Sequence, residues 1–121
     1  MSEAFADPAA ITGYHAHIYY DPGTRDAAER LRTAIGKLFA VQLGRMHDRP
    51  VGPHPGAMYQ IAFAVEELPR LLPWLMLNRN GFDVLVHPNT DDAYTDHSAF
   101  AMWLGKPQPL RLEVLRRSAP G

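Results

Sequence analysis

Two histidines lie two positions apart in the segment YHAHIYY, residues 14–20, whose aromatic and β-branched alternation is typical of a β-strand. Side chains at positions i and i+2 of a strand point to the same side of the sheet, so His15 and His17 share one face. Ala16 and Ile18 then point to the opposite, buried face. Paired imidazoles on an accessible face can bind a metal ion or transfer protons near neutral pH.

The chain has six histidines in 121 residues and no cysteine. The lack of cysteine excludes disulfides, thiolate ligands and a cysteine nucleophile. His54 lies between two prolines in the loop VGPHPG, and His87 ends the apolar segment DVLVHP. His97 follows Asp96 in a polar segment, and His47 lies in a weak strand pattern, where we interpret it as a surface residue. The histidines are therefore the main candidates for chemistry.

The composition indicates one globular domain, with 46% hydrophobic and 21% charged residues. The formal net charge is −1 and the twelve basic residues are scattered, so we expect no binding to nucleic acid. No apolar run approaches the roughly 20 residues that cross a bilayer, and the N-terminus does not resemble a signal peptide. We expect a cytoplasmic protein with no membrane association. The predicted domain covers residues 13–115, between flexible tails at residues 1–12 and 116–121.

The periodicity of the chain predicts an α+β fold. Strands are predicted at residues 14–20, 43–49, 58–65, 83–88 and 109–115, and helices at residues 27–39 and 66–81. Residues 89–105 are predicted as a loop with a short helix. The order indicates a ferredoxin-like βαββαβ sandwich with an added C-terminal strand, in which both helices cover one face of an antiparallel sheet.

Strand parity places several of these side chains together on the open face. In the usual 4-1-3-2 strand order the first and fourth strands are neighbours, so His87 lies beside His15 and His17. The last predicted strand adds Arg111 and Glu113 to the same face. Imidazoles with one carboxylate are the ligands of many non-haem Fe(II) sites. Solvated surface histidines, and a salt-bridge role for Glu113, are the alternatives.

His54 poses a geometric problem in this fold. Its loop joins the second and third strands at the end of the sheet opposite His87, and an ordinary strand is about 17–20 Å long. Either the loop folds back over the open face, or His54 completes a site in a second subunit. The open face also carries apolar side chains, which predicts a homodimer that covers it. These side chains are Met58, Ala62, Leu85 and Leu115.

The segments YHAHIYY, GPHP, LVHPNT, DH and WLG, in this order, resemble the DOPA 4,5-dioxygenase family of fungi and bacteria. The resemblance covers residues 14–114, nearly the whole domain. One departure is Asp91 in HPNTDD, where the family pattern has glycine. The resemblance implies extradiol cleavage of a catechol by O₂ at a mononuclear Fe(II).

The resemblance and the strand faces together assign roles to individual residues. The predicted metal ligands are His17, His87, His54 and Glu113. The residues predicted to act as acid, base or proton relay are His97, His15 and Tyr19, and His15 is also a candidate ligand. Substrate contacts are assigned to Gln60, Trp103 and Arg111, although Trp103 suits core packing as well. For His97 the alternative is a place in the first turn of a short helix that Asp96 caps.

Two other functions are compatible with the same residues. Zinc also accepts imidazole and carboxylate ligands, so a zinc-dependent hydrolase or isomerase is one alternative. The other is a non-enzymatic dimeric binding module that takes up a metal incidentally. The sequence does not specify which catechol a dioxygenase of this kind would use.

Overall fold

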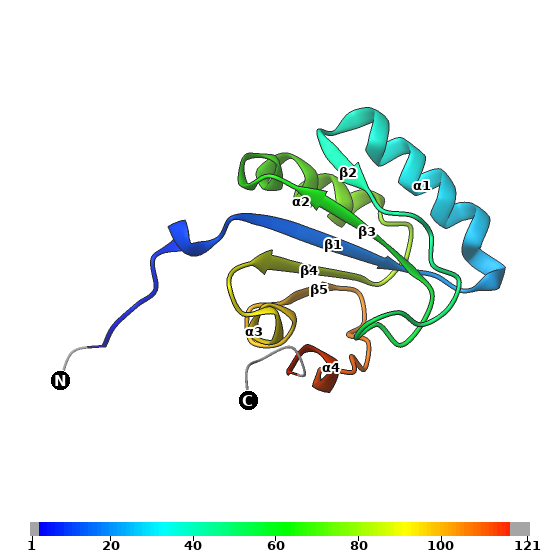
Figure 1. Cartoon of the computed structure of the whole chain (residues 1–121). Coiled ribbons are helices and arrows are strands. Elements are labelled where there is room, and N and C mark those ends of the chain that lie inside the picture. Colours follow the sequence, from blue (N-terminus) through cyan, green and yellow to red (C-terminus); the bar gives the residue numbers. More distant parts are fainter. Residues whose placement is uncertain (1–2, 117–121) are drawn as a thin grey trace.

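The computed structural model describes residues 3–116, and its centre is a five-stranded antiparallel sheet in the order β2-β3-β1-β4-β5 (Figure 1). The strands are β1 (Gly13–Tyr19), β2 (Val41–Leu43), β3 (Met58–Phe63), β4 (Val84–Asn89) and β5 (Met102–Leu104). The first four have the predicted ferredoxin-like order, and β5 adds to the free edge of β4. The predicted fold class is confirmed.

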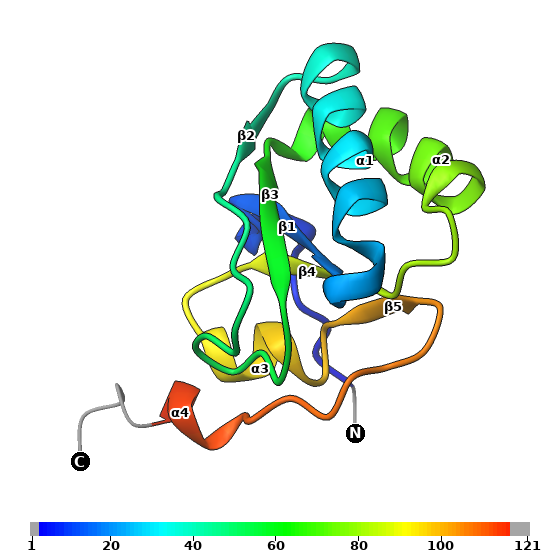
Figure 2. The same cartoon turned by 90° about the vertical axis from the view of Figure 1, so that its right-hand side faces the viewer.

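Two helices, α1 (Arg25–Leu38) and α2 (Leu68–Asn78), cover one face of the sheet (Figure 2). The chain enters α1 through a capping box, in which Asp21 and Thr24 exchange side-chain and backbone hydrogen bonds. In α1, Ala28, Leu31 and Ile35 recur at helical spacing and are buried. These apolar residues pack the helix against the sheet.

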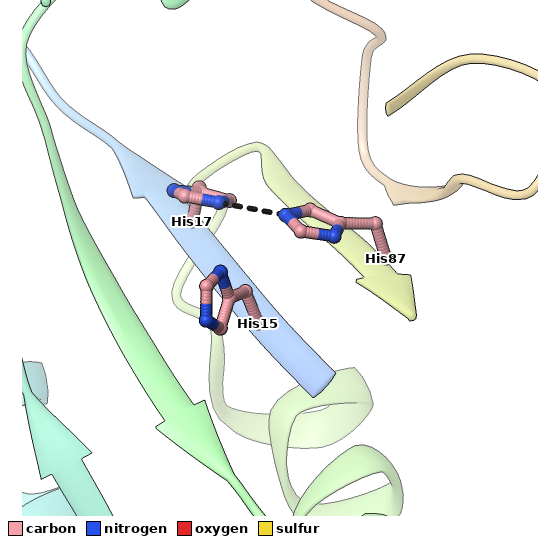
Figure 3. Close-up of side chains that lie close together, drawn as sticks. All are labelled: His15, His17 and His87. Atoms are coloured by element: carbon pink, nitrogen blue, oxygen red, sulfur yellow. Dashed lines mark hydrogen bonds between the residues drawn. The ribbon is translucent and has the colours of Figure 1, made fainter. Parts of the chain in front are cut away.

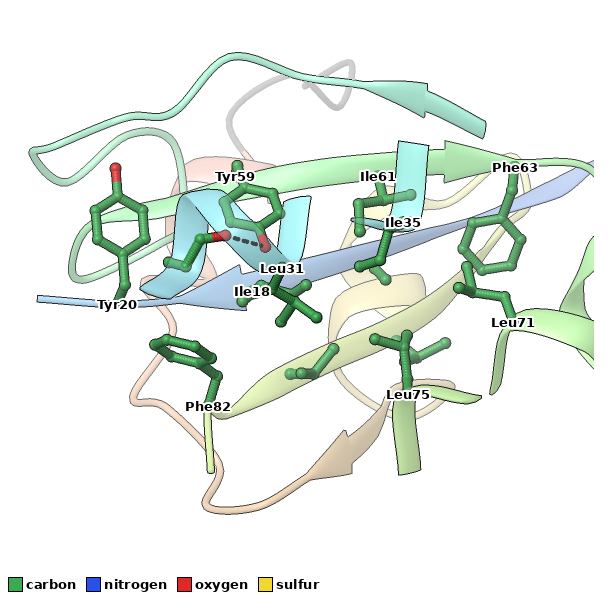
Figure 4. Packing of buried hydrophobic residues seen from close by; sticks show 14 residues of the cluster. Ile18, Tyr20, Leu31, Ile35, Tyr59, Ile61, Phe63, Leu71, Leu75 and Phe82 are labelled. Carbon is green, nitrogen blue, oxygen red and sulfur yellow. Dashed lines mark hydrogen bonds between the residues drawn. The ribbon is translucent and has the colours of Figure 1, made fainter. Parts of the chain in front are cut away.

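The main core lies between these helices and the sheet (Figure 4). Ala16 and Ile18 of β1 are fully buried in it, and the hydroxyl of Tyr59 donates to the backbone carbonyl of Ala28 in α1. Val84 and Val86 of β4 belong to the same cluster. The strand parity predicted from the sequence is therefore confirmed, and the intervening residues of β1 and β4 point to the opposite face.

The opposite face is covered in part by later segments of the same chain. Helices α3 (Ala93–His97) and α4 (Glu113–Arg116) lie on this side of the sheet (Figure 1). A second apolar cluster of Tyr19, Met58 and Leu85 is buried here, with Trp103 and Leu110 packed against it. The argument for a homodimer is therefore weakened, because Met58 and Leu85, two of the side chains that a partner was expected to cover, are already buried within this chain.

Three predicted elements differ from the structure. The second strand is Val41–Leu43 rather than residues 43–49, and only an isolated bridge joins His47 to Met58. The predicted strand at residues 109–115 is wrong, because this segment turns at Leu110 and ends in helix α4. The fifth strand is Met102–Leu104, within the segment predicted as loop and short helix, and the short helix is α3. In residues 109–115, Leu110 packs against the second apolar cluster, and the described segment pairs with no strand of the sheet.

The two predicted tails are described only in part. Pro8–Ala10 form a short 3-10 helix whose N-cap is Asp7, and Thr12 donates two hydrogen bonds to the carbonyl of Asn89. At the other end, Arg116 closes α4 and its guanidinium lies 3.9 Å from the ring centre of Tyr94. The remainder of the predicted C-terminal tail lies outside the described residues. Within residues 3–116, no helix has the length and apolar character needed to cross a membrane.

Candidate metal centre

The register of β1 and β4 brings three histidines together on the face away from α1 and α2. His15 lies directly opposite His87, and His17 lies opposite Leu85. One ring nitrogen from each of His15, His17 and His87 lies within 4.8 Å of the others (Figure 3). Nε2 of His17 lies 3.1 Å from Nε2 of His87, within hydrogen-bond distance. Neighbouring strands of one sheet thus hold all three rings.

A second group of three histidines shares His17 with the first. One ring nitrogen from each of His17, His54 and His97 also lies within 4.8 Å of the others. The ring centre of His54 is 4.3 Å from that of His17, and the ring centre of His97 is 4.0 Å from that of His87. Five of the six histidines therefore form one cluster, in which His17 is common to both groups.

His54 reaches the cluster because its loop folds back over the sheet within the same chain. The backbone N–H of His54 donates to the carbonyl of Val51, and Gly52 between them has a positive φ of 54°. The backbone N–H of Arg111 donates to the carbonyl of Pro53 at 2.8 Å and ties the loop to the C-terminal segment. Of the two alternatives for His54, the structure has the one that needs no second subunit.

Helix α3 brings His97 to the cluster, but by contacts other than those expected. Its N-cap is Asp92, and His97 is the last residue of the helix rather than a residue of its first turn. Asp96 is buried and accepts hydrogen bonds from the backbone N–H and the hydroxyl of Thr90, at 2.8 and 2.6 Å. Asp96 therefore ties α3 to the chain leaving β4. This pair was not predicted, because a Thr and an Asp six residues apart form no recognisable local pattern.

The hydrogen bonds of His87 and His97 to backbone carbonyls leave Nε2 of each ring without a proton, and Nε2 of His87 can accept a hydrogen bond from Nε2 of His17. Nδ1 of His87 donates to the carbonyl of Pro88 at 2.9 Å, and Nδ1 of His97 donates to the carbonyl of Ala93 at 2.8 Å. Because a carbonyl only accepts, a neutral ring bonded in this way has a bare Nε2. Histidines that bind metals in proteins usually have this bond on the second nitrogen.

The positions of the ring nitrogens in the cluster can be compared with those of a metal site. His17 offers a metal two alternative nitrogens: Nδ1 is buried and has no hydrogen-bond partner among the described residues, and Nε2 faces Nε2 of His87. Two nitrogens bonded to one ion at about 2.1 Å lie roughly 3.0 Å apart at right angles and roughly 3.4 Å apart at the tetrahedral angle. The 3.1 Å between Nε2 of His17 and Nε2 of His87 falls between these two values, and in the metal-free protein it is a hydrogen-bond distance. The donor set therefore fits a metal held by imidazoles.

Burial keeps these imidazoles neutral. Desolvation, with a smaller contribution from neighbouring histidines, lowers the pKa of His54 to about 4. Desolvation likewise lowers the pKa of His87 to about 3, and the pKa of His17 lies well below its usual value. The pKa of His15 is also lowered, first by burial and then by His97. Neutral rings are the form that binds a metal, so the site needs no deprotonation near pH 7.

These pKa shifts predict that acid destabilises the metal-free protein. An unfolded histidine takes up a proton near pH 6.5, whereas folded His54 and His87 stay neutral until about pH 4 and about 3. Between these values the unfolded state binds more protons, so the free energy of unfolding falls as the pH falls below 6.5. Urea unfolding at about pH 7 and about pH 5, above the range where most carboxylates titrate, measures the loss. Equal or greater stability at the lower pH would contradict it.

The remaining predicted site residues are divided between the cluster and the surface. The hydroxyl oxygen of Tyr19 lies 2.6 Å from Nδ1 of His54, and its ring stacks on Trp103 with centres 5.8 Å apart. Gln60 lies opposite His17 across β1 and β3, on the same face. Arg111 is exposed and contacts the His54 loop through its backbone.

Glu113 does not lie where the sequence placed it. It belongs to helix α4, its side chain is exposed, and it is in neither group of converging ligand atoms. The prediction depended on a strand at residues 109–115, which does not form. The ligand atoms that do converge are all imidazole nitrogens, and the described residues add no carboxylate to them.

The segment that follows β5, residues 105–110, was not predicted to cross the histidine face either. The carboxylate of Asp83 accepts hydrogen bonds from the backbone N–H of Lys106 and the side chain of Gln108, both at 2.8 Å. Gly105 has φ of 85°, and a Cβ there would lie 2.5 Å from Oδ1 of Asp83. Asp83 thus holds the segment that brings Leu110 onto the buried Tyr19 and Leu85.

Comparisons with known proteins agree with this geometry. Residues 14–114 match the model of the Dopa 4,5-dioxygenase family. A DOPA 4,5-dioxygenase of Amanita muscaria is 35% identical over 87% of this chain, and this chain covers 50% of that protein. An uncharacterised 21.2 kDa protein of Botryotinia fuckeliana is 33% identical over 95% of this chain, which covers 71% of it. The chain thus spans half the length of the Amanita protein.

A solved structure has the same fold. The crystal structure of a protein of Nostoc punctiforme, described as a candidate dioxygenase, superposes with a TM-score of 0.93 at 49% identity. The match covers 95% of this chain and 100% of the other. The likeness extends from the sheet to the later segments that cover the histidine face.

Proposed function

This chain belongs to the Dopa 4,5-dioxygenase family, and we propose that it is an extradiol dioxygenase that opens the ring of a catechol with O₂ at a mononuclear non-haem Fe(II). Family membership supports a dioxygenase, and the cluster of converging histidines supports dependence on a metal. The substrate we propose is a DOPA-like dihydroxyphenyl compound, because a relative with 35% identity is named for DOPA.

The observation that carries the proposal is the group of His15, His17 and His87 on two paired strands. Their converging nitrogens are the feature of the described residues that best fits a metal. We infer that these three residues hold the ion. Three protein ligands leave open coordination positions, which a catechol with two oxygens and O₂ both require.

The residues beside the metal ligands supply the rest of the chemistry. A bound Fe(II) would supply the one-electron chemistry that allows a catechol to react with O₂. Nε2 of His97 is bare in the neutral ring, so it can take a proton from a catechol hydroxyl. Trp103 and Gln60 are the proposed contacts to the aromatic ring and its hydroxyls. Arg111, beside the His54 loop, is the proposed contact to a charged substituent of the substrate.

One observation favours a second candidate, a zinc-dependent hydrolase or isomerase. The converging ligand atoms are imidazole nitrogens without a carboxylate, and three histidines also form catalytic zinc sites. Such an enzyme would act without consuming O₂. The two candidates therefore differ in one measurable reactant.

Metal-specific oxygen uptake tests the proposal. Protein purified without oxygen is loaded with Fe(II) or, as a matched control, with Zn(II), and then mixed with DOPA in aerated buffer. We expect O₂ consumption with iron only, because zinc has no accessible redox change. Equal behaviour of the two forms, or a reaction of the zinc form without O₂ uptake, would support the second candidate.

The homodimer stays a prediction. Because His54 reaches the cluster within its own chain, the site does not need a partner subunit, and the remaining argument for a dimer is the half-buried Ala62 and Leu115 on the histidine face. Light scattering at micromolar concentration would give the mass of a dimer if the prediction holds. The cytoplasmic location is likewise a prediction from the sequence.

A further inference from the structure

The hydrogen bond between Tyr19 and His54 connects a strand to the loop that folds over it. Tyr19 is the last residue of β1, and its hydroxyl oxygen lies 2.6 Å from Nδ1 of His54. Both residues are buried, with 7% and 4% of their surface exposed. Within residues 3–116 the hydroxyl has no other hydrogen-bond partner. The bond is therefore short and buried.

The direction of this bond follows from the protons available. A tyrosine near neutral pH is protonated, and its hydroxyl has one proton to donate. Nδ1 of His54 is the acceptor within reach, so this nitrogen is bare and the neutral ring has its proton on Nε2. A buried hydroxyl that did not donate would leave its proton without a partner, which is costly.

His54 therefore differs from the two histidines whose bonds leave Nε2 bare. In His87 and His97 a backbone carbonyl holds the proton on Nδ1. In His54 a hydroxyl holds it on Nε2. The neutral ring then has no free nitrogen for a metal, because one nitrogen accepts from Tyr19 and the other has the proton. It has instead an N–H that can donate a hydrogen bond.

We propose that Tyr19 is a positioning residue that holds His54 in the Nε2–H form, so that His54 donates a hydrogen bond to the substrate instead of binding the metal. The role toward the substrate rests on the proposed function, whereas the state of the ring does not. Two features fix the pair in place. The ring of Tyr19 stacks on Trp103, and the His54 loop is tied to Arg111 by the Pro53 carbonyl.

Histidine ring NMR tests the state of His54 directly. Long-range ¹H–¹⁵N spectra of labelled protein distinguish a bare ring nitrogen from a protonated one, and His54→Gln assigns the signal. We expect a bare Nδ1 in the metal-free protein and in the zinc-loaded protein, where zinc serves as a diamagnetic probe. Tyr19→Phe keeps the aromatic ring but removes the hydroxyl, so the preference for one form should be lost.

The neighbouring tyrosine offers a matched control. The hydroxyl of Tyr20 donates to Asp48 and to the carbonyl of His47, on the other face of the sheet. Tyr20→Phe also removes a buried hydroxyl, yet it should leave the His54 signal unchanged. In the iron-loaded protein we expect Tyr19→Phe to lower kcat by about 10- to 100-fold with unchanged metal content, and Tyr20→Phe to retain kcat.

Two results would overturn the inference. One is a proton on Nδ1 of His54 in the metal-free protein, which would mean that Tyr19 accepts the bond. The other is a shift of a His54 nitrogen to a metal-bound position on addition of zinc, together with loss of metal from His54→Gln. If the protein binds no metal at all, the proposed function fails, and the metal-free spectra still decide the state of His54.

Discussion

Replacing His17 with alanine should reduce bound Fe(II) from about one ion per chain to less than about a tenth, and should abolish activity with it. His17 is common to both groups of converging histidines, so its loss leaves neither group with three ligands. It also removes the buried Nδ1 that has no partner among the described residues. Metal analysis of protein loaded without oxygen measures the effect.

The matched control for this variant is His47→Ala. His47 bridges to Met58 through its backbone and belongs to neither group of converging ligands, so its loss should leave the metal content unchanged. Circular dichroism should show that both variants fold. His17→Ala with full metal occupancy would mean that the ion, if it binds, is held elsewhere.

Replacing His97 with alanine should leave the metal in place but lower kcat by roughly a hundredfold, as loss of a general acid or base does. His97 lies at the end of α3, outside the two strands, and its ring centre is 4.0 Å from that of His87. Its Nδ1 donates to Ala93, so its bare Nε2 is free to move a proton. Metal content and steady-state kinetics, measured on the same preparation, separate the two effects.

Ser98→Ala serves as the control, because Ser98 adjoins His97 as the C-cap of α3 and its hydroxyl donates to the carbonyl of Tyr94, near the start of the helix. It perturbs the same end of the helix without removing an imidazole and should retain activity. If His97→Ala loses iron, His97 is a ligand and the second group of histidines holds the metal. If its turnover is normal, His97 has only a structural part in α3.

The sequence predicted the part of the site that depends on regular strands. Alternation alone places His15 and His17 on one face of β1, and the common strand order places His87 beside them. Both inferences need only the period of a strand and the pairing of neighbours. The confirmed sheet order and the burial of Ala16 and Ile18 show that these local rules hold here.

The parts that the sequence left open or did not predict depend on contacts between distant segments. The return of His54 over the sheet was one of two alternatives, and it depends on the left-handed backbone of Gly52 and on the bond from Arg111 to Pro53, which lie far apart in the chain. Glu113 was misplaced because alternating apolar residues in a short segment also suit a loop and one turn of helix. The hydrogen bonds between Asp96 and Thr90 likewise could not be predicted from a local sequence pattern.

The mass of the reaction product tests the central claim most directly. Protein loaded with Fe(II) without oxygen is given DOPA and ¹⁸O₂, and the product is identified by mass spectrometry. Extradiol cleavage combines the catechol and O₂ into a single product. We therefore predict a ring-opened compound that contains both atoms of the O₂. The native protein should form it, and His17→Ala should not. An oxidised catechol with an intact ring and no added ¹⁸O, or no product at all, would contradict the account.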